Sequence, residues 1–222
     1  VLTATGDSGE HPQIGYYIVT VGEKRNADQS EVVASVAQAF LGTRIGCAQC
    51  HNHPLEKYTQ DDYYHFAAFF APLRLKREDS KQGSTALSIA SVDGEQQGRR
   101  RNSRGKMAGR IGVVQPRTGE FLEPQTLDGE ECDLAPGDDP RVKLADWMVD
   151  PDNEFFAGAM VNRLWRHFMG VGLVEPVDDL RASNPPTNPR LWQALIAEFV
   201  AQEYDLKHLM RVILNSRAYQ LS

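Results

Sequence analysis

The residues Cys47-Ala48-Gln49-Cys50-His51 carry the clearest chemical signal in the chain. Two thiols separated by two residues and followed at once by an imidazole form the pattern that attaches a c-type haem. In that attachment the two sulfurs add to the two vinyl groups of the porphyrin, and the imidazole binds the iron from one face of the ring. The motif therefore predicts a covalent haem c on Cys47 and Cys50, with His51 as the proximal iron ligand.

His53 lies two positions after the motif and supports a second interpretation. Two cysteines and two histidines can fill the tetrahedral shell of zinc, which makes zinc the alternative cofactor and His53 an alternative metal ligand. Zinc modules usually place their second ligand pair about a dozen residues away, whereas here all four groups fall within seven residues. A bare redox dithiol is a third interpretation, but such motifs need a βαβ context that the sequence lacks.

The sixth ligand of a bound iron must come from outside the motif, or its position stays open. His53 is too close to His51 in the chain to swing easily to the opposite face of the porphyrin. The candidates for this distal position are His65, in the helix expected after the motif, and His167, near the end of a C-terminal helix. A lone helical histidine is more commonly an ordinary surface or core residue, so each is a candidate only.

Carboxylates elsewhere in the chain open a different chemical class, a metal-dependent hydrolytic domain. The metal would be held by His51 and His53 together with carboxylates from Asp61, Asp62, Asp178 or Asp179. Paired aspartates are more often helix caps or solvated charges. A last alternative is a structural module without chemistry, in which the cysteines are reduced or joined to each other.

The composition limits the class of protein. A chain of 222 residues can form one large domain or two small ones. Its net charge of −6 argues against nucleic acid as a partner, and no apolar run approaches the roughly 18–20 residues of a membrane-spanning helix. Three cysteines are too few for a disulfide scaffold. The third, Cys132, lies in an acidic loop whose charges are expected to raise the pKa of its thiol and lower its reactivity.

Hydrophobic periodicity predicts a mainly α-helical fold, with two helices in the N-terminal part. Ser30 is expected to cap a helix over 31–41, which Gly42 ends. Thr59, followed three positions later by an acidic residue, forms a capping box in outline and opens a helix to about Ala71. These two helices would lie on either side of the Cys/His motif.

The helix after the motif carries an aromatic stripe at helical spacing, formed by Tyr63, Phe66, Ala67 and Phe70. Such a stripe is more often ordinary core than the wall of a cofactor pocket, because aromatic side chains are generally buried. If haem is bound, the same stripe would be well placed to pack against the porphyrin.

Four helix starts are expected in the C-terminal half, at Asp139-Pro140, Asp152, Asn188-Pro189 and Asp205. The first helix continues to about Val149. The other three are expected to run over about 153–169, 189–203 and 206–215. The C-terminal half is therefore predicted to be a helical domain.

Short strands are expected near 16–21, which is rich in β-branched and aromatic residues, and near 111–122, around a turn. Residues 76–110 are basic and contain glycine and serine throughout, so we expect a long flexible insertion on the surface. The chain is thus predicted to divide into residues 1–75 with the Cys/His motif, a linker over 76–130, and a helical domain over 131–222.

Further motifs extend the signature over most of the chain. They are Phe40-Leu41-Gly42, Asn52-His53-Pro54, Asp62-Tyr63-Tyr64 and Phe69-Phe70-Ala71 in the N-terminal part, and Leu144-Ala145-Asp146-Trp147, Val161-Asn162-Arg163-Leu164-Trp165, Gly170-Val171-Gly172-Leu173, Glu175-Pro176-Val177-Asp178-Asp179 and Asp205-Leu206-Lys207 in the C-terminal part. Together with the thiol motif, these residues resemble the planctomycete cytochrome-c-like proteins. In that family the end of a cytochrome-like domain joins the start of an adjoining domain of unknown function.

The resemblance implies a fragment of a large exported bacterial protein, periplasmic or secreted, with the remainder of the same polypeptide at both ends. A start at Val1 and a stop at Ser222, directly after a helical pattern, fit that expectation, and an export signal or anchor would then lie in the remainder. Export matters because c-type haem is attached outside the cytoplasmic membrane. The motif and the resemblance together predict an electron carrier that meets a redox partner protein, rather than a catalyst.

Overall fold

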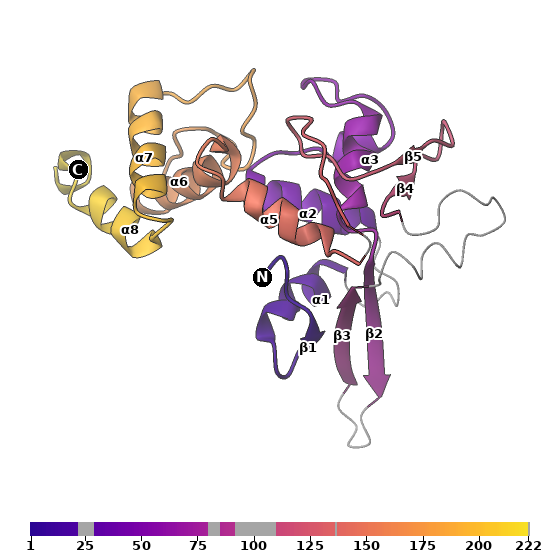
Figure 1. Ribbon diagram of the computed structural model, residues 1–222. Helices are drawn as coiled ribbons and strands as arrows, with labels where there is room; N and C mark the ends of the chain where they lie inside the picture. The colour runs from indigo at the N-terminus through magenta and orange to yellow at the C-terminus, as the bar shows by residue number, and fades with distance from the viewer. Residues whose placement is uncertain (22–28, 80–84, 92–109, 136, 222) are drawn as a thin grey trace. The chain divides into compact units, whose positions relative to one another are not determined.

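The computed structural model describes residues 1–21, 29–79, 85–91, 110–135 and 137–221 (Figure 1). The protein is mainly α-helical, as predicted, and forms two compact units. Unit 1 comprises Val1–Ser35, Gly46–His53 and Lys57–Asp146, and unit 2 comprises Val36–Ile45, Pro54–Glu56 and Trp147–Ser222. The units are interleaved in sequence, because helices α2 (Gln29–Leu41) and α5 (Pro140–Met148) contribute to both. The three predicted domain segments stay a prediction.

Unit 1 begins with a short strand, β1 (Gly6–Asp7), a 3₁₀ turn, η1 (Pro12–Ile14), and a helix, α1 (Gly15–Val21). The prediction of a strand near 16–21 is therefore wrong. Ile14 and Tyr17 are both buried, at the spacing of a helical turn, and the hydroxyl of Thr20 donates to the carbonyl of Tyr16 four residues back. Burial of one helical face outweighed the β-propensity of the segment, which is a weak prior.

A buried arginine ties the start of the chain to helix α5. The side chain of Arg141 is 1% exposed, pairs with Asp139 at 2.5 Å and donates to the carbonyls of Leu2 and Ala4 at 3.1 and 3.2 Å. Its guanidinium also lies over the ring of Tyr17, and burial raises the pKa of that phenol to about 12. A planar group with five donors suits this task, since each buried carbonyl needs a partner.

Helix α3 (Gln60–Ala68) follows the motif and has the predicted capping box. The Thr59 hydroxyl accepts from the Asp62 N–H, and the Asp62 carboxylate accepts from the Thr59 N–H at 2.7 Å. The helix ends somewhat before Ala71, and its apolar side is buried. It packs through Ala68 on Val113 of β4.

The strands of unit 1 form two small sheets. The first has the order β1-β3-β2, in which β2 (Leu73–Asp79) and β3 (Thr85–Ser91) are antiparallel. The second is the hairpin of β4 (Val113–Val114) and β5 (Phe121–Leu122), within the predicted strand region. The segment expected to be a long flexible insertion, 76–110, includes paired parts of β2 and β3, and its parts 80–84 and 92–109 lie outside the described residues.

Unit 2 is built on four helices, α6 (Glu154–Met169), α7 (Pro189–Ala201), α8 (Leu206–Leu214) and α9 (Arg217–Gln220). Asn188 and Asp205 cap α7 and α8 as predicted. The cap of α6 is Asn153 and not the predicted Asp152. The short helix α9 was not predicted.

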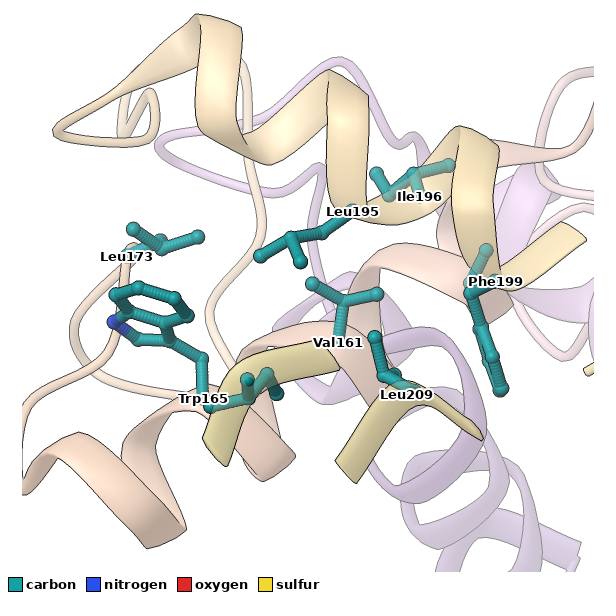
Figure 2. Packing of buried hydrophobic residues seen from close by; sticks show 9 residues of the cluster. Val161, Trp165, Leu173, Leu195, Ile196, Phe199 and Leu209 are labelled. Carbon is teal, nitrogen blue, oxygen red and sulfur yellow. The ribbon is translucent and has the colours of Figure 1, made fainter. Parts of the chain in front are cut away.

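The core of unit 2 lies where α6, α7 and α8 meet (Figure 2). Val161 of α6 lies next to Leu195 of α7 and Leu209 of α8, and Trp165 of α6 lies next to Leu173. Burial of large aliphatic and aromatic side chains contributes about 1.5–3 kcal/mol for each residue. This cluster fixes one side of α6, and it includes Leu173 of the loop that follows the helix. None of the helices in the described part of the chain is long and apolar enough to cross a membrane.

Candidate functional site

The thiol motif begins on a 3₁₀ turn of unit 1, η2 (Gly46–Gln49), and Cys50 and His51 follow this turn directly. The backbone N–H of Cys50 donates to the carbonyl of Cys47 at 3.4 Å. Side chains three residues apart eclipse one another on such a turn, so the two thiols emerge on the same side. Both cysteines are exposed and neither forms a disulfide. The arrangement leaves two neighbouring thiols accessible from solvent.

One ring nitrogen of His51 is hydrogen-bonded to the protein. Its Nδ1 lies 2.8 Å from the carbonyl oxygen of Asn52, and the side chain is exposed. A carbonyl oxygen only accepts, so Nδ1 carries the hydrogen, and in the neutral ring the lone pair is on Nε2. The contact therefore selects the tautomer that can bind a metal through Nε2.

Two side chains of helix α3 are hydrogen-bonded to the end of the turn, at Gln49. The Gln60 side-chain amide and the Tyr64 hydroxyl both donate to the carbonyl of Gln49, at 3.1 and 3.2 Å. Burial raises the pKa of Tyr64, and the charge on a Cys50 thiolate would raise it further. The motif thus rests on two side chains of the first turns of α3.

His53 does not complete a metal shell with the motif. Its N–H donates to the carbonyl of Tyr58 at 2.8 Å, which closes a loop, and its side chain is partly buried. Within the described ranges, no three side chains of histidine, cysteine, aspartate or glutamate are gathered around a point where a metal ion could sit. The four ligands considered for zinc do not converge.

The two distal candidates lie in different units. In unit 1, Nδ1 of His65 is 2.6 Å from the carbonyl of Glu123, next to β5, and the carboxylate of Glu123 pairs with Arg110 at 2.5 Å. In unit 2, His167 is exposed in the last turn of α6. Its ring and that of Phe168 form a T-shaped pair with centroids 4.9 Å apart. The identity of the sixth ligand stays a prediction.

The aspartates considered for a hydrolytic site have other partners. Asp61 accepts from the Gln115 amide at 3.2 Å, and Asp62 caps α3. In unit 2, Asp178 and Asp179 hold side chains of their own unit, as described below. Each carboxylate is thus engaged in structure.

The aromatic stripe of α3 is core. Tyr63, Phe66 and Phe70 are at most 2% exposed, and Ala67 is 3% exposed. The rings of Phe66 and Phe70 meet edge to face at 6.0 Å. The interpretation as ordinary core is confirmed.

Cys132 differs from the motif cysteines. Burial raises the pKa of its thiol, and the charge on Glu130 raises it further, against an opposing effect of Lys143. The prediction of a raised pKa is confirmed in direction, although burial, rather than the acidic loop alone, is the larger cause.

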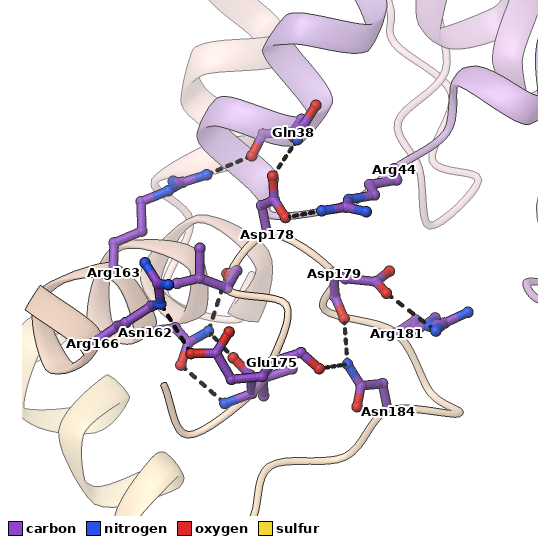
Figure 3. A network of polar contacts seen from close by, with 12 residues as sticks. Gln38, Arg44, Asn162, Arg163, Arg166, Glu175, Asp178, Asp179, Arg181 and Asn184 are labelled. Atoms are coloured by element: carbon purple, nitrogen blue, oxygen red, sulfur yellow. Dashed lines mark hydrogen bonds and ion pairs between the residues drawn. The ribbon is translucent and has the colours of Figure 1, made fainter. Parts of the chain in front are cut away.

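A polar network around the loop after α6 was not predicted (Figure 3). Asn162 is fully buried and donates to the carbonyls of Val174 and Val177 at 2.8 and 3.0 Å, while its own oxygen accepts from the Val174 N–H at 3.0 Å. Glu175 accepts from Arg166 at 3.0 Å and from the N–H of Gly172. A polar residue inside an otherwise apolar helical face was the one sequence signal for this network.

The same loop is tied to α2 and the segment after it. Asp178 accepts from the side chains of Gln38 and Arg44, and Arg163 donates to two carbonyls of α2. Further along, Asp179 pairs with Arg181 at 3.1 Å. All these contacts lie within unit 2.

Two models of planctomycete-type domains of unknown function match the chain, each over less than half of its length. Residues 11–75 match the model PSCyt2, described as a protein of unknown function (DUF1549), and residues 140–222 match PSD1, described as a protein of unknown function (DUF1553). No curated protein and no solved structure matches the chain. The matches agree with the resemblance in their order and in their family, while the cytochrome-like nature of the first domain stays a prediction.

Proposed function

We propose that this chain binds haem c covalently through Cys47 and Cys50 and transfers single electrons as part of a larger exported bacterial protein. His51 is the proximal iron ligand. The observation that carries the proposal is the hydrogen bond from Nδ1 of His51 to the carbonyl of Asn52 at 2.8 Å, because in the neutral ring it leaves the lone pair on Nε2, and the side chain is exposed directly after Cys50 in the chain.

The donor set fits the covalent attachment. The two thiols are free and exposed, and the hydrogen bond from the Cys50 N–H to the Cys47 carbonyl closes the turn between them. Each S–H adds across one vinyl group, so that a carbon–sulfur bond forms, the hydrogen goes to the other vinyl carbon, and no oxidant is needed. Cys47 and Cys50 would hold the ring through these two bonds, which thiols three positions apart on one turn could form together.

Bound haem supplies one-electron chemistry at its iron. The chain itself binds the ring through two sulfurs and orients the proximal imidazole through Asn52. Because Cys47, Cys50 and His51 are all exposed, a haem attached to them would lie at the surface of unit 1. A surface site gives a redox partner protein direct access to the edge of the ring.

The experiment is expression of the chain with the maturation machinery for c-type cytochromes, followed by absorption spectroscopy of the purified protein. Wild type should show a Soret band that survives denaturation, and Cys47→Ser or Cys50→Ser should leave one thioether, visible as a shifted α-band of the pyridine haemochrome. Cys132→Ser is the matched control and should leave the spectrum unchanged. A wild-type protein without a Soret band would overturn the proposal.

The ligand assignment has its own test. His51→Ala should convert the iron spectrum to that of a haem lacking its proximal imidazole, whereas His53→Ala should not. His65→Ala and His167→Ala, measured in parallel, identify the distal ligand by loss of the low-spin spectrum. An unchanged spectrum in His51→Ala would show that another residue binds the iron.

A further inference from the structure

We propose that Asn52 is a positioning residue, whose side chain anchors the motif to helix α3 and whose backbone carbonyl thereby holds His51 in the Nδ1–H tautomer. The inference deepens the proposed function and rests on it in one respect, which is that a lone pair on Nε2 serves iron ligation. The hydrogen bonds themselves are properties of the polypeptide alone.

The side chain of Asn52 meets an unpartnered donor of α3. The Gln60 N–H is the first of the helix and has no acceptor within it. Asn52 Oδ1 accepts from this N–H at 3.1 Å, while the Thr59 hydroxyl accepts from the Asp62 N–H. The helix start is therefore capped twice, once by its own capping box and once by the residue that follows His51.

The backbone carbonyl of Asn52 contacts His51, and not helix α3. Its carbonyl oxygen accepts from Nδ1 of His51 at 2.8 Å. A residue whose side chain is fixed on α3 has little freedom to turn its carbonyl, so the acceptor for His51 stays in place. The ring of an exposed histidine without such a partner exchanges between both tautomers in water.

The turn on the other side of His51 is fixed by the same helix. Gln60 is 7% exposed, and its side-chain amide donates to the Gln49 carbonyl, which also accepts from Tyr64. The side-chain oxygen of Gln60 accepts from Arg117 at 3.4 Å. Helix α3 thus holds the chain before His51 at Gln49 and after it at Asn52. A ring held between two such anchors is preorganised for ligation.

The test is the tautomer of His51 in the haem-free, reduced protein, read from the chemical shifts of its two ring nitrogens in a long-range ¹H–¹⁵N spectrum. Wild type should show Nδ1 as the protonated nitrogen and Nε2 as the unprotonated one. In Asn52→Ala the two shifts should move toward each other, as expected for exchanging tautomers. Asn52→Asp keeps the Oδ1 acceptor and should restore the wild-type pattern.

Asn188→Ala is the matched control. Asn188 also accepts a helix N–H with its side chain, that of Leu191 at 3.1 Å, but it lies in unit 2. This variant should leave the His51 shifts unchanged. The His65 signals should stay the same in every variant, since His65 has its own carbonyl partner. Wild-type shifts of His51 that persist in a folded Asn52→Ala would overturn the inference. If that variant unfolds, Asn52→Leu replaces it, since leucine removes the Oδ1 acceptor but keeps a side chain of similar size, and wild-type His51 shifts in that variant would likewise overturn the inference.

Failure of the two proposals can be told apart. A protein that takes up no haem, yet shows the Nδ1–H tautomer only when residue 52 offers an acceptor, would overturn the haem proposal and support the role of Asn52. A haem-loaded wild type whose haem-free form has mixed His51 tautomers would overturn the role of Asn52 and leave the haem proposal standing.

Discussion

The guanidinium group of Arg44 forms an ion pair with the carboxylate of Asp178, although 134 positions separate the two residues in the sequence (Figure 3). Arg44 belongs to the segment matched by the first family model and Asp178 to the segment matched by the second. Both lie in unit 2. The two matched segments therefore share a compact unit, and part of the first domain is stabilised by residues of the second.

Replacement of Asp178 by asparagine should destabilise unit 2 at neutral pH. Partial burial raises the pKa of Asp178, but hydrogen bonds from Gln38 and Arg44 outweigh it, so the pKa lies below its ordinary value of 3.8. Because Arg44 is about half exposed, we expect a loss of only about 0.5–1 kcal/mol in the free energy of unfolding. Urea denaturation followed by tryptophan fluorescence measures it, since all three tryptophans belong to unit 2.

The same variant has a pH signature. A carboxylate with a lowered folded-state pKa stabilises the protein above its ordinary pKa, and this contribution is lost as the pH falls through the folded-state value. The difference between wild type and Asp178→Asn should therefore be full at pH 7 and shrink below about pH 4. Asp152→Asn, at an exposed aspartate, is the control and should cost less than about 0.5 kcal/mol. If the difference in the free energy of unfolding is the same at pH 7 as below about pH 4, the ion pair is not its source.

Asn162 should matter more to stability than its exposed neighbours. Its side chain makes three hydrogen bonds to the loop after α6 from a fully buried position, so Asn162→Ala leaves buried backbone groups without partners. We expect a loss of about 2–4 kcal/mol in the free energy of unfolding. Asn184→Ala, which removes two hydrogen bonds from a partly exposed position, should cost about 1 kcal/mol. Equal losses in the two variants would contradict the importance of burial.

Gly42 should tolerate no side chain. Its φ of +63° lies in the left-handed region, and an added Cβ would come within 2.8 Å of Leu180. Gly170 ends α6 with a φ of +80° but has open space around it. We expect Gly170→Ala to cost about 1 kcal/mol from backbone strain alone, and Gly42→Ala about 2–4 kcal/mol because the contact adds to the strain. Thermal unfolding of the two variants measures the difference, and similar midpoints would show that Leu180 moves aside.

Local signals predicted the fold well. The capping box at Thr59, the proline after Asn188 and the glycine after α2 act within one helical turn, so the sequence contains everything that decides them. The start of α6 was misplaced by one residue because Asp152 and Asn153 are both good caps, and the bond to the Phe155 N–H selects the second.

Non-local contacts could not be predicted in the same way. β2 and β3 contain short alternations of apolar and polar residues, at Leu73-Arg74-Leu75-Lys76 and Leu87-Ser88-Ile89, but their pairing depends on partners that no local pattern specifies. For the same reason the helix Gly15–Val21 was taken for a strand. At the site, residue types indicated the thiols and His51, but the tautomer of His51 depends on the orientation of the Asn52 carbonyl, which only the folded loop defines.

The three thiols should differ in reactivity in the haem-free protein. Cys47 and Cys50 are exposed, whereas burial raises the pKa of Cys132. Since the thiolate is the reactive form, iodoacetamide at neutral pH should modify Cys47 and Cys50 first, and Cys132 more slowly and at higher pH. Peptide mass spectrometry over a time course follows each site. Modification of Cys132 as fast as the motif cysteines would contradict the structure of its loop.

The central claim is that Cys47 and Cys50 bind haem covalently, and the intact mass of the denatured protein tests it most directly. After expression with the maturation machinery for c-type cytochromes, we expect the mass of the polypeptide plus one haem, and the mass of the bare polypeptide for the Cys47→Ser, Cys50→Ser double variant. The bare polypeptide mass for the wild-type protein, under conditions in which a control cytochrome is fully loaded, would contradict the account.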